Sequence, residues 1–479
     1  MLSRIHVVLV FFLLPCSLMP VGVVRSEPLF KLAVDPFGTE AGTAPAARTP
    51  WEGAQPLPAA PSPAFPSANE VPKRIVASLP ELTEIALANH PTAREAWAAA
   101  RAQAAELGIL QAEYLPQLSG NLCVTHSQSL SSSGVSVPSQ TRYGPNVSLS
   151  YVLFDFGVRA NQVEAARYRL LAANLIQNRV LQDIVLAVEQ TYYQLLGFEQ
   201  LLSANRLTLK NAETSLQAAN GRRKAGLATS GDVFRAQTAA AQARLALQRT
   251  EGEVAKSRGQ LANAIGMPVG TEFVLEPWRE KTEVEDLDRS IEGLLDQAKQ
   301  NRPDLISAEA EVRAARAATN AVAATGLPTL ELGATTGRTL FTDDRGGISS
   351  YSIGLNLRIP IFTGFRNTYQ VRQAKAFADQ AEAQRDALFR DTELGVWQAY
   401  FDLKTAYAAL ASAESLLASA NLSAEAALAR YKVGVGSLLE LITAQADQAN
   451  ARVQVIQAQL DWYTGFARLN HALGSLPQS

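Results

Sequence analysis

Cysteine and histidine are scarce in this sequence. Two cysteines, Cys16 and Cys123, and four histidines occur in 479 residues. The histidines are scattered without His-Glu-x-x-His spacing and the cysteines are not paired, so we expect no metal site. Because Cys16 lies in the predicted export segment, described below, we also expect no disulfide within the mature chain.

Basic excess and phosphate-binding loops are missing as well. Lysine plus arginine number 43 against 45 for aspartate plus glutamate. The chain therefore has no excess of positive charge to neutralise a phosphate backbone, and nucleic acid is not an expected partner. Gly221 and Gly226 bracket a basic turn, but this turn lacks the lysine-serine or lysine-threonine ending of a P-loop. We therefore expect no catalytic residue and no cofactor, and the sequence argues against an enzyme.

Long apolar runs are confined to the start of the chain. Arg4 precedes an apolar run at 7–14, and small residues follow up to Ser26, which is the layout of a secretory signal peptide. We assign 1–26 to this peptide; a lipid on Cys16 is the alternative. No later run reaches about 18 apolar residues, so a chain that crosses a membrane has to do so as a closed β-barrel.

Proline is concentrated in one stretch that follows this peptide. Nine of the 23 prolines lie between residues 35 and 73, among alanine, glycine and serine. Such a composition does not sustain a helix or a β-ladder. We interpret 27–77 as a flexible leader, and its role is not predicted.

The remainder of the sequence repeats itself once at a long period. The spacing between matched segments drifts from 212 to 207 or 208 residues, with the main shift between Pro328 and Tyr351, where a loop absorbs it. The matched pairs are 89–91 with 301–303, 115–118 with 327–330, 143–157 with 351–364, 192–193 with 400–401, 223–226 with 431–434, and 264–266 with 472–474. We therefore divide the chain into two structural repeats, 78–277 and 278–479, each ordered helix, strand, strand, long helix, helix.

Apolar and polar residues alternate over 147–154 and, more cleanly, over 351–361, which predicts one strand in each repeat. A partner strand precedes each, at 117–125 and 329–336. Their length suits a strand that crosses a membrane, although an ordinary half-buried antiparallel sheet alternates in the same way. Four strands alone in a mostly helical protein leave two uncovered edges. We therefore favour a barrel closed by strands from several chains.

Helical patterns fill the rest of both repeats. Alanine-rich helices are predicted at 82–113 and 291–325, and longer ones at 158–220 and 366–429, which contain no proline. Some 60 residues extend about 90 Å as a helix. Alanine allows close approach and apolar residues at three- and four-residue spacing form seams, so these helices must pack side by side.

Two glycine turns, 226–232 and 434–440, link long helices at the end far from the strands. In each, a hydroxyl residue follows the glycine and precedes an acidic residue. Capping of a helix N-terminus explains this pattern. A compatible interpretation is that the tips of a helical tube bind a partner's helical hairpin and surround the pore with carboxylates.

This order of helices and strands, in duplicate, resembles the TolC family of outer-membrane factors over nearly all of 78–474. The short motifs are Leu115-Pro116-Gln117-Leu118, Phe154-Asp155-Phe156-Gly157, Phe362-Thr363-Gly364 and the two tip turns. The resemblance implies a mainly α protein whose homotrimer forms one 12-stranded membrane β-barrel, continued by a long periplasmic α-helical barrel. It places the protein in the outer membrane of a Gram-negative bacterium.

The resemblance also implies partners and a function. The partners are a periplasmic adaptor and an inner-membrane pump or ABC transporter, and the protein is the passive exit duct of a tripartite efflux pump or type I secretion system. An exported structural coiled-coil envelope protein without channel activity is the alternative, but it has no need of duplicated amphipathic strands. The exported substrate is not predicted.

Functional residues follow from the same resemblance. The periplasmic gate maps to Tyr431, Asp232 and Glu440, while Gly436 and Thr443 depart from the family's arginine and second acidic residue. We expect a bulky charged side chain at Gly434 to block assembly with the adaptor without preventing trimer formation. The residues implied in adaptor docking are Gly226, Leu227, Val433, Gly434 and Val435.

Overall fold

Two similar series of helices and strands make up the computed structural model, which describes residues 43–44, 46–50, 74–128, 139–276, 290–342 and 346–475. All of these residues belong to one unit, Gly38–Ser479. The predicted signal peptide and most of the predicted leader lie outside the described residues, as does Cys16. Among the described helices, none is both long enough and apolar enough to cross a membrane.

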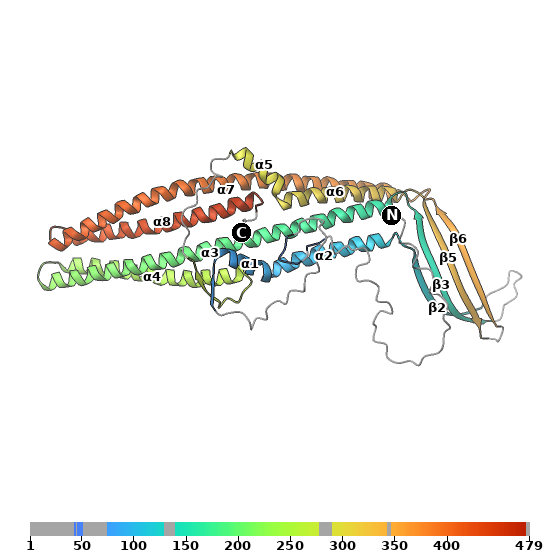
Figure 1. The fold of residues 1–479 in the computed structure, drawn as a ribbon, viewed down its shortest axis with the longest axis horizontal. Helices are drawn as coiled ribbons and strands as arrows, with labels where there is room; N and C mark the ends of the chain where they lie inside the picture. Colours follow the sequence, from blue (N-terminus) through green and yellow to red (C-terminus); the bar gives the residue numbers. More distant parts are fainter. Residues whose placement is uncertain are drawn as a thin grey trace. The chain divides into compact units, whose positions relative to one another are not determined.

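Each series runs from two shorter helices through two strands to a long helix and a returning helix (Figure 1). The mainly α fold class with four longer strands is confirmed. The first series consists of α1 (Leu79–Asn89), α2 (Pro91–Ala112), β2 (Gln117–Ser127), β3 (Gln140–Phe154), α3 (Val158–Lys224) and α4 (Ser230–Ala264). The second consists of α5 (Ile291–Asn301), α6 (Pro303–Ala324), β5 (Thr329–Phe341), β6 (Gly347–Arg358), α7 (Arg366–Val433) and α8 (Leu438–Ala472). A short parallel pair joins β1 (Arg74–Ala77) to β4 (Glu272–Leu275).

The two repeats share one antiparallel sheet of order β2-β3-β5-β6. Within the described residues, β2 and β6 pair on one side only, so each presents an open edge. The apolar residues of β6 are exposed: Tyr351 is 87% and Ile353 72% accessible. A single chain therefore leaves both the edges and an apolar face of this sheet uncovered.

Proline determines where the shorter helices begin. Pro91 and Pro303 open α2 and α6, where the missing N–H is not needed. The preceding residues, His90 and Arg302, are extended, as the residue before a proline prefers. These breaks separate α1 from α2 and α5 from α6, whereas the sequence pattern predicts a single helical stretch in each place.

The long helices contain 67 residues in α3 and 68 in α7, each about 100 Å at 1.5 Å per residue. Both follow two successive residues with positive φ, Phe156-Gly157 in the first repeat and Gly364-Phe365 in the second. The sequence comparison paired Gly157 with Gly364, but the N-caps are Gly157 and Phe365. Each repeat thus uses one glycine and one phenylalanine for this left-handed turn, with glycine second in the first repeat and first in the second. Because the N-caps Gly157 and Phe365 are equivalent, the offset between the repeats is 208 residues along both long helices.

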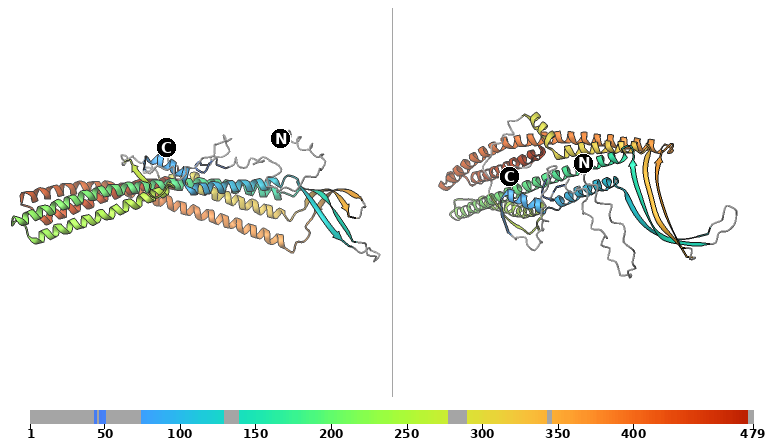
Figure 2. Two further views of the ribbon diagram at one scale, coloured as in Figure 1. Left: turned by 90° about the horizontal axis from the view of Figure 1, so that it is seen from below. Right: turned by 45° about the vertical axis from the view of Figure 1, so that its right-hand side comes forward.

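Helix packing buries mainly alanine and leucine. In the first repeat α3 packs against α2 and α4, and in the second α7 packs against α6 and α8 (Figure 2). Leu195 and Leu403 are fully buried at equivalent positions of the two long helices. The repeats are joined because α3 also packs against α6 and α8.

Part of the predicted flexible leader is held against the first repeat, which differs from the expectation. Trp97 Nε1 donates a hydrogen bond to the Ala44 carbonyl at 2.7 Å. Gln177 Nε2 donates to the carbonyls of Thr49 at 3.1 Å and of Ala46 at 3.4 Å. A proline-rich segment without a helix or ladder still has free carbonyl groups, and α2 and α3 supply donors for them.

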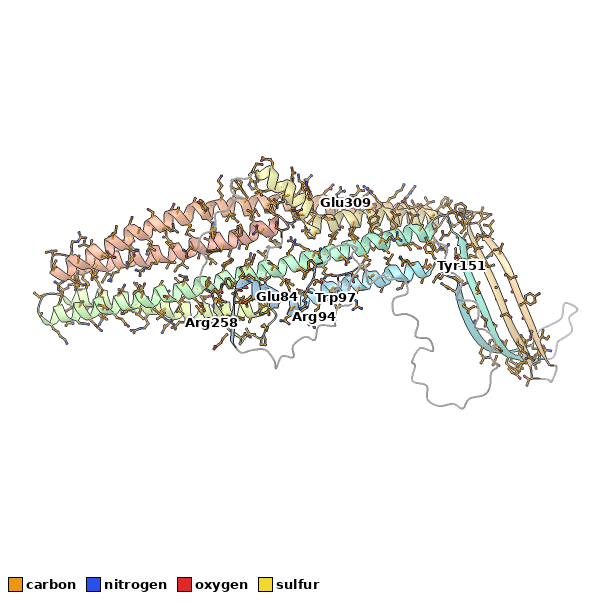
Figure 3. The ribbon with its side chains drawn as sticks, viewed as in Figure 1. Glu84, Arg94, Trp97, Tyr151, Arg258 and Glu309 are labelled. Atoms are coloured by element: carbon orange, nitrogen blue, oxygen red, sulfur yellow. The ribbon has the colours of Figure 1, made fainter. Side chains whose placement is uncertain are left out.

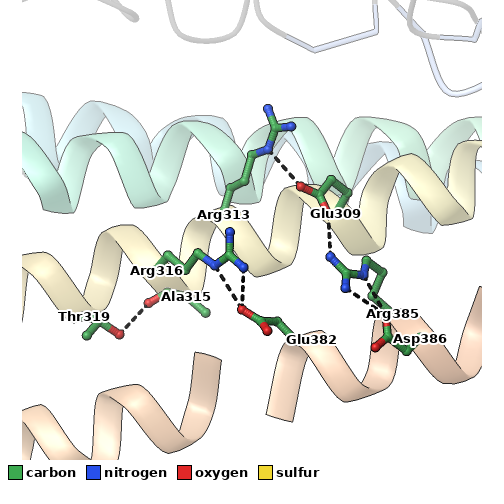
Figure 4. A network of polar contacts seen from close by, with 8 residues as sticks. All are labelled: Glu309, Arg313, Ala315, Arg316, Thr319, Glu382, Arg385 and Asp386. Carbon is green, nitrogen blue, oxygen red and sulfur yellow. Dashed lines mark hydrogen bonds and ion pairs between the residues drawn. The ribbon is translucent and has the colours of Figure 1, made fainter. Parts of the chain in front are cut away.

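The second repeat uses these positions differently. With the repeat offsets of 212 and 208, Glu309 corresponds to Trp97 and Arg385 to Gln177. Figure 3 labels Trp97 and Glu309 on the ribbon. Arg385 Nη1 lies 3.0 Å from Glu309 Oε2, within a surface network that joins α6 to α7 (Figure 4). At these equivalent positions the first repeat has two neutral donors that contact the leader, and the second repeat has an ion pair.

Candidate functional site

The two tip turns have the geometry that their glycines predict. Gly226 has φ 76° and Gly434 φ 88°, which are conformations that residues other than glycine rarely adopt. Gly434 N–H donates to Tyr431 O at 3.1 Å, and Val435 N–H donates to Arg430 O at 3.1 Å. The glycines thus satisfy the last carbonyls of the long helices and reverse the chain.

The acidic residues of both turns lie in the first turn of a returning helix. Asp232 accepts hydrogen bonds from Thr229 Oγ1 at 2.7 Å and Thr229 N at 3.0 Å, while Thr229 Oγ1 accepts from Asp232 N. These bonds, that from the Thr229 hydroxyl first, lower the pKa of Asp232. Ser437 caps α8 by accepting from Glu440 N at 3.1 Å, but the Glu440 carboxylate instead forms an ion pair with Arg430.

Tyr431, predicted as a gate residue, is buried rather than open to solvent. Its side chain is 6% exposed and packs with Val233, Leu438 and other apolar residues of the tip. The Arg222 guanidinium lies 4.6 Å from the centre of its ring, and Arg222 Nη1 donates to Tyr431 O at 3.0 Å. Arg222 therefore connects the first repeat to the second at this end of the helices.

Sequence reasoning missed the two arginines, Arg222 and Arg430. A signal was available, because they occupy equivalent positions just before the matched segments 223–226 and 431–434. The structure also bears on Gly436, where the family's arginine is absent. A Cβ added there would lie 2.9 Å from Arg430 Cβ, so the turn has no space for a larger side chain without a shift. Thr443 is exposed on α8.

The predicted docking residues fall into two groups. Leu227, Val433 and Val435 are large, apolar and 73%, 74% and 77% exposed. The other two, Gly226 and Gly434, have positive φ, and a Cβ at Gly434 would lie 3.2 Å from Arg222 Nη2. A substitution at Gly434 would therefore combine backbone strain with any effect on a partner.

A second polar cluster joins the repeats near the other end of α8. Arg302 Nη1 donates to Ala472 O at 3.2 Å, and its guanidinium pairs with Asp304. His471 Nε2 lies 2.6 Å from Asp183 Oδ1, and Arg179 Nε 3.1 Å from the same oxygen. Burial alone would raise the pKa of Asp304, but the bond with Arg302 and the nearby charges lower it overall.

Glu189 is a half-buried carboxyl on α3. Burial raises its pKa from 4.5 to about 7, so the folded chain binds more protons than the unfolded chain between these values. Stability contributed by this group is therefore complete below about pH 4.5 and is lost as the pH rises through about 7. We expect Glu189→Gln to raise the thermal midpoint at pH 8 and to flatten its decline between pH 5 and 8, measured by circular dichroism.

The matched control for this prediction is Glu164→Gln, which changes an exposed carboxylate on the same helix. It should leave the pH profile of the native protein unchanged. If Glu189→Gln and the native protein show the same dependence of the thermal midpoint on pH, burial does not raise the pKa of Glu189.

Chemistry at the tips is limited to packing and charge. Within the described ranges, no three histidine, cysteine, aspartate or glutamate side chains are arranged to hold a metal ion. The site offers a buried tyrosine, an acidic residue hydrogen-bonded to a threonine, an acidic residue ion-paired with an arginine, and three exposed apolar side chains at the ends of long helices.

Comparison with known proteins matches both repeats. A model of the outer membrane efflux protein family matches residues 82–267 and 294–475. Protein CyaE of Bordetella pertussis is 32% identical over 409 residues, which cover 84% of this chain and 85% of that protein. The outer membrane efflux protein BepC of Brucella suis is 23% identical over 381 residues, covering 79% and 81%. The solved structure of the outer-membrane channel OprN has a TM-score of 0.76 at 22% identity, covering 83% of this chain and 90% of that one.

Proposed function

Because the chain belongs to the outer membrane efflux protein family, we propose that three copies of it form one continuous channel. The protein is an outer-membrane exit duct of a Gram-negative efflux or type I secretion system, and it extends into the periplasm. In the proposed trimer, four strands from each chain close a twelve-stranded barrel, and the helices continue this channel below the membrane.

The observation that carries the trimer is the unequal packing of equivalent helices. In the first repeat α3 packs against α6 and α8 of the second repeat, whereas α7, its equivalent, has no comparable packing against α2 or α4 in the described chain. The corresponding face of α7 carries Leu394, Trp397 and Phe401, which are 55%, 50% and 40% exposed. The first repeat of a second copy would cover this face.

The open edges of the sheet favour the same arrangement. β6 of one copy can pair with β2 of the next, because each lacks a neighbour on its outer side among the described strands. A head-to-tail contact of this kind repeats until the ring closes. Closure removes every edge and turns the uncovered apolar face of the strands toward lipid.

The tip turns are the proposed contact with a periplasmic adaptor, through which an inner-membrane transporter is coupled. Exposed Leu227, Val433 and Val435 supply apolar side chains beside the glycines Gly226 and Gly434. We also propose that Asp232 and Glu440 face the closed end of the channel and that Tyr431 is held in the closed position by Arg222. An exported substrate would pass without chemical change.

Extraction of purified outer membranes in mild detergent tests this proposal. We expect a mass of about three mature chains after correction for bound detergent, since four strands are too few to close a barrel. The same sample should give ion conductance in a planar lipid bilayer. A single chain, or recovery in the soluble periplasmic fraction, would contradict the shared barrel; a trimer without conductance would favour the structural coiled-coil alternative.

A further inference from the structure

Three polar contacts join the first repeat to α8 and to the turn that follows it, within one chain. Ser215 Oγ on α3 donates to Gln445 Oε1 at 3.1 Å. Near the other end of α8, His471 Nε2 lies 2.6 Å from Asp183 Oδ1. Beside it, Gln182 Nε2 donates to Gly474 O at 2.8 Å. These contacts define the register in which α3 packs along α8.

The internal duplication assigns each of these residues an equivalent 208 positions away. Ser215 corresponds to Ser423 on α7, and Gln445 corresponds to Gln237 on α4. Both residue types are unchanged between the repeats, although the equivalent helices do not pack against each other in the described chain. A serine and a glutamine with the same chemistry are therefore present on two surfaces that are not packed together in the described chain.

The other two contacts have equivalents that can also form hydrogen bonds. Asp183 corresponds to Asp391 and His471 to Asn263, which can donate to a carboxylate. Gln182 corresponds to Arg390, which can donate to the carbonyl of Gly266, the equivalent of Gly474. Gly266 and Gly474 share positive φ, at 70° and 75°, so the acceptor carbonyls belong to similar turns.

All of these equivalent side chains are available for a partner. Ser423, Gln237, Asp391 and Asn263 are exposed, and in the described part of the chain their side chains make no hydrogen bond. We propose that the partner is a second copy of this chain, whose α4 packs along α7 in the register that pairs Ser423 with the neighbour's Gln237 and Asp391 with the neighbour's Asn263. This register rests on the proposed trimer and specifies how its chains meet.

The inferred contact between chains is not an exact copy of the contact within a chain. Arg179, which lies 3.9 Å from Asp304, corresponds to Ala387, and Asp304 corresponds to Thr92. The charged part of the internal contact is thus missing between chains, while the three hydrogen-bonding pairs are kept. The register is therefore expected from polar pairing and from the apolar face of α7 rather than from ion pairs.

Cysteine cross-linking in intact outer membranes tests the register. In a Cys123→Ser background, one protein carries Gln237→Cys with Ser423→Cys and a second carries Asn263→Cys with Asp391→Cys. A short bismaleimide is used rather than direct oxidation, because glutamine, asparagine and aspartate side chains reach farther than a cysteine, whereas a disulfide needs Cα atoms within about 7 Å. We expect both proteins to give covalent species of two and three chains on denaturing gels.

The control pairs Gln237→Cys with Glu425→Cys, since Glu425 lies two residues from Ser423 and so points away on the helix. It should remain a single chain on the gel. If either test pair fails to cross-link in protein that has trimer mass in mild detergent, the register is wrong and the trimer stands. If the detergent-extracted mass is that of one chain, both proposals fail.

Discussion

Replacing Val435 with glutamate is expected to reduce export by at least about tenfold while the protein still reaches the outer membrane as a trimer. Val435 is 77% exposed at the α7–α8 turn, so the folded chain accommodates the new side chain without strain. A partner surface that covers it would bury an unpaired carboxylate, which costs several kcal/mol, and about 1.4 kcal/mol already corresponds to a tenfold loss of affinity. The measurement is export by whole cells together with co-purification of the adaptor.

Two controls separate docking from other effects of this substitution. Val435→Thr keeps the shape without the charge and should retain most of the export. Val269→Glu places the same charge on a valine that is 72% exposed after α4, away from the tips, and should export normally. Full export by Val435→Glu would remove this turn from the docking surface. Val435 is a better test than Gly434, where positive φ adds backbone strain to any side chain.

Replacing Gly474 with alanine is expected to lower the unfolding free energy by about 2–5 kcal/mol. A left-handed backbone penalty contributes about 1–2 kcal/mol, and overpacking contributes about 1–3 kcal/mol. Gly474 has φ 75°, and a Cβ there would lie 2.9 Å from backbone atoms of Arg302 and Asn301. Backbone cannot move aside as a flexible side chain can. The measurement is the denaturant midpoint of the detergent-solubilised protein, followed by circular dichroism.

Gly270→Ala is the matched control, because its added Cβ meets nothing within 4 Å and its φ is not in the left-handed range. This variant should unfold like the native protein. Equal midpoints for Gly474→Ala and Gly270→Ala would mean that the end of α8 is not held against the α5–α6 junction. That result would also weaken the register inferred from Gly474 and its equivalent.

Sequence patterns predicted the features that depend on local chemistry. The long helices were expected because 158–220 and 366–429 lack proline, and α3 and α7 occupy these ranges with a few more residues at their C-terminal ends. The tip turns follow from Gly226 and Gly434, and the strand pairs from alternation. The order of the helices and strands was predictable because each short sequence motif, weak by itself, occurs once in each repeat.

Features that depend on contacts between distant residues were not predictable in this way. The contact of Arg222 with Tyr431 joins residues 209 positions apart in the chain, and no local pattern marks it. The leader was interpreted from composition alone, yet Trp97 and Gln177 bind its carbonyl groups. Hydrogen-bond donors that bind a proline-rich segment lie elsewhere in the sequence, so composition does not reveal them.

The duplication also has an evolutionary consequence. The proposed ring of three identical duplicated chains would have six contacts between repeats, encoded by two separate sets of residues. The two sets already differ, because Arg179 is equivalent to Ala387 and Asp304 is equivalent to Thr92. Each set can therefore change without changing the other. A ring of six identical single repeats would lack this freedom, because any change would recur at all six contacts. Fusion of two repeats in one gene therefore allows the contact within a chain to become strong while the contact between chains stays adjustable.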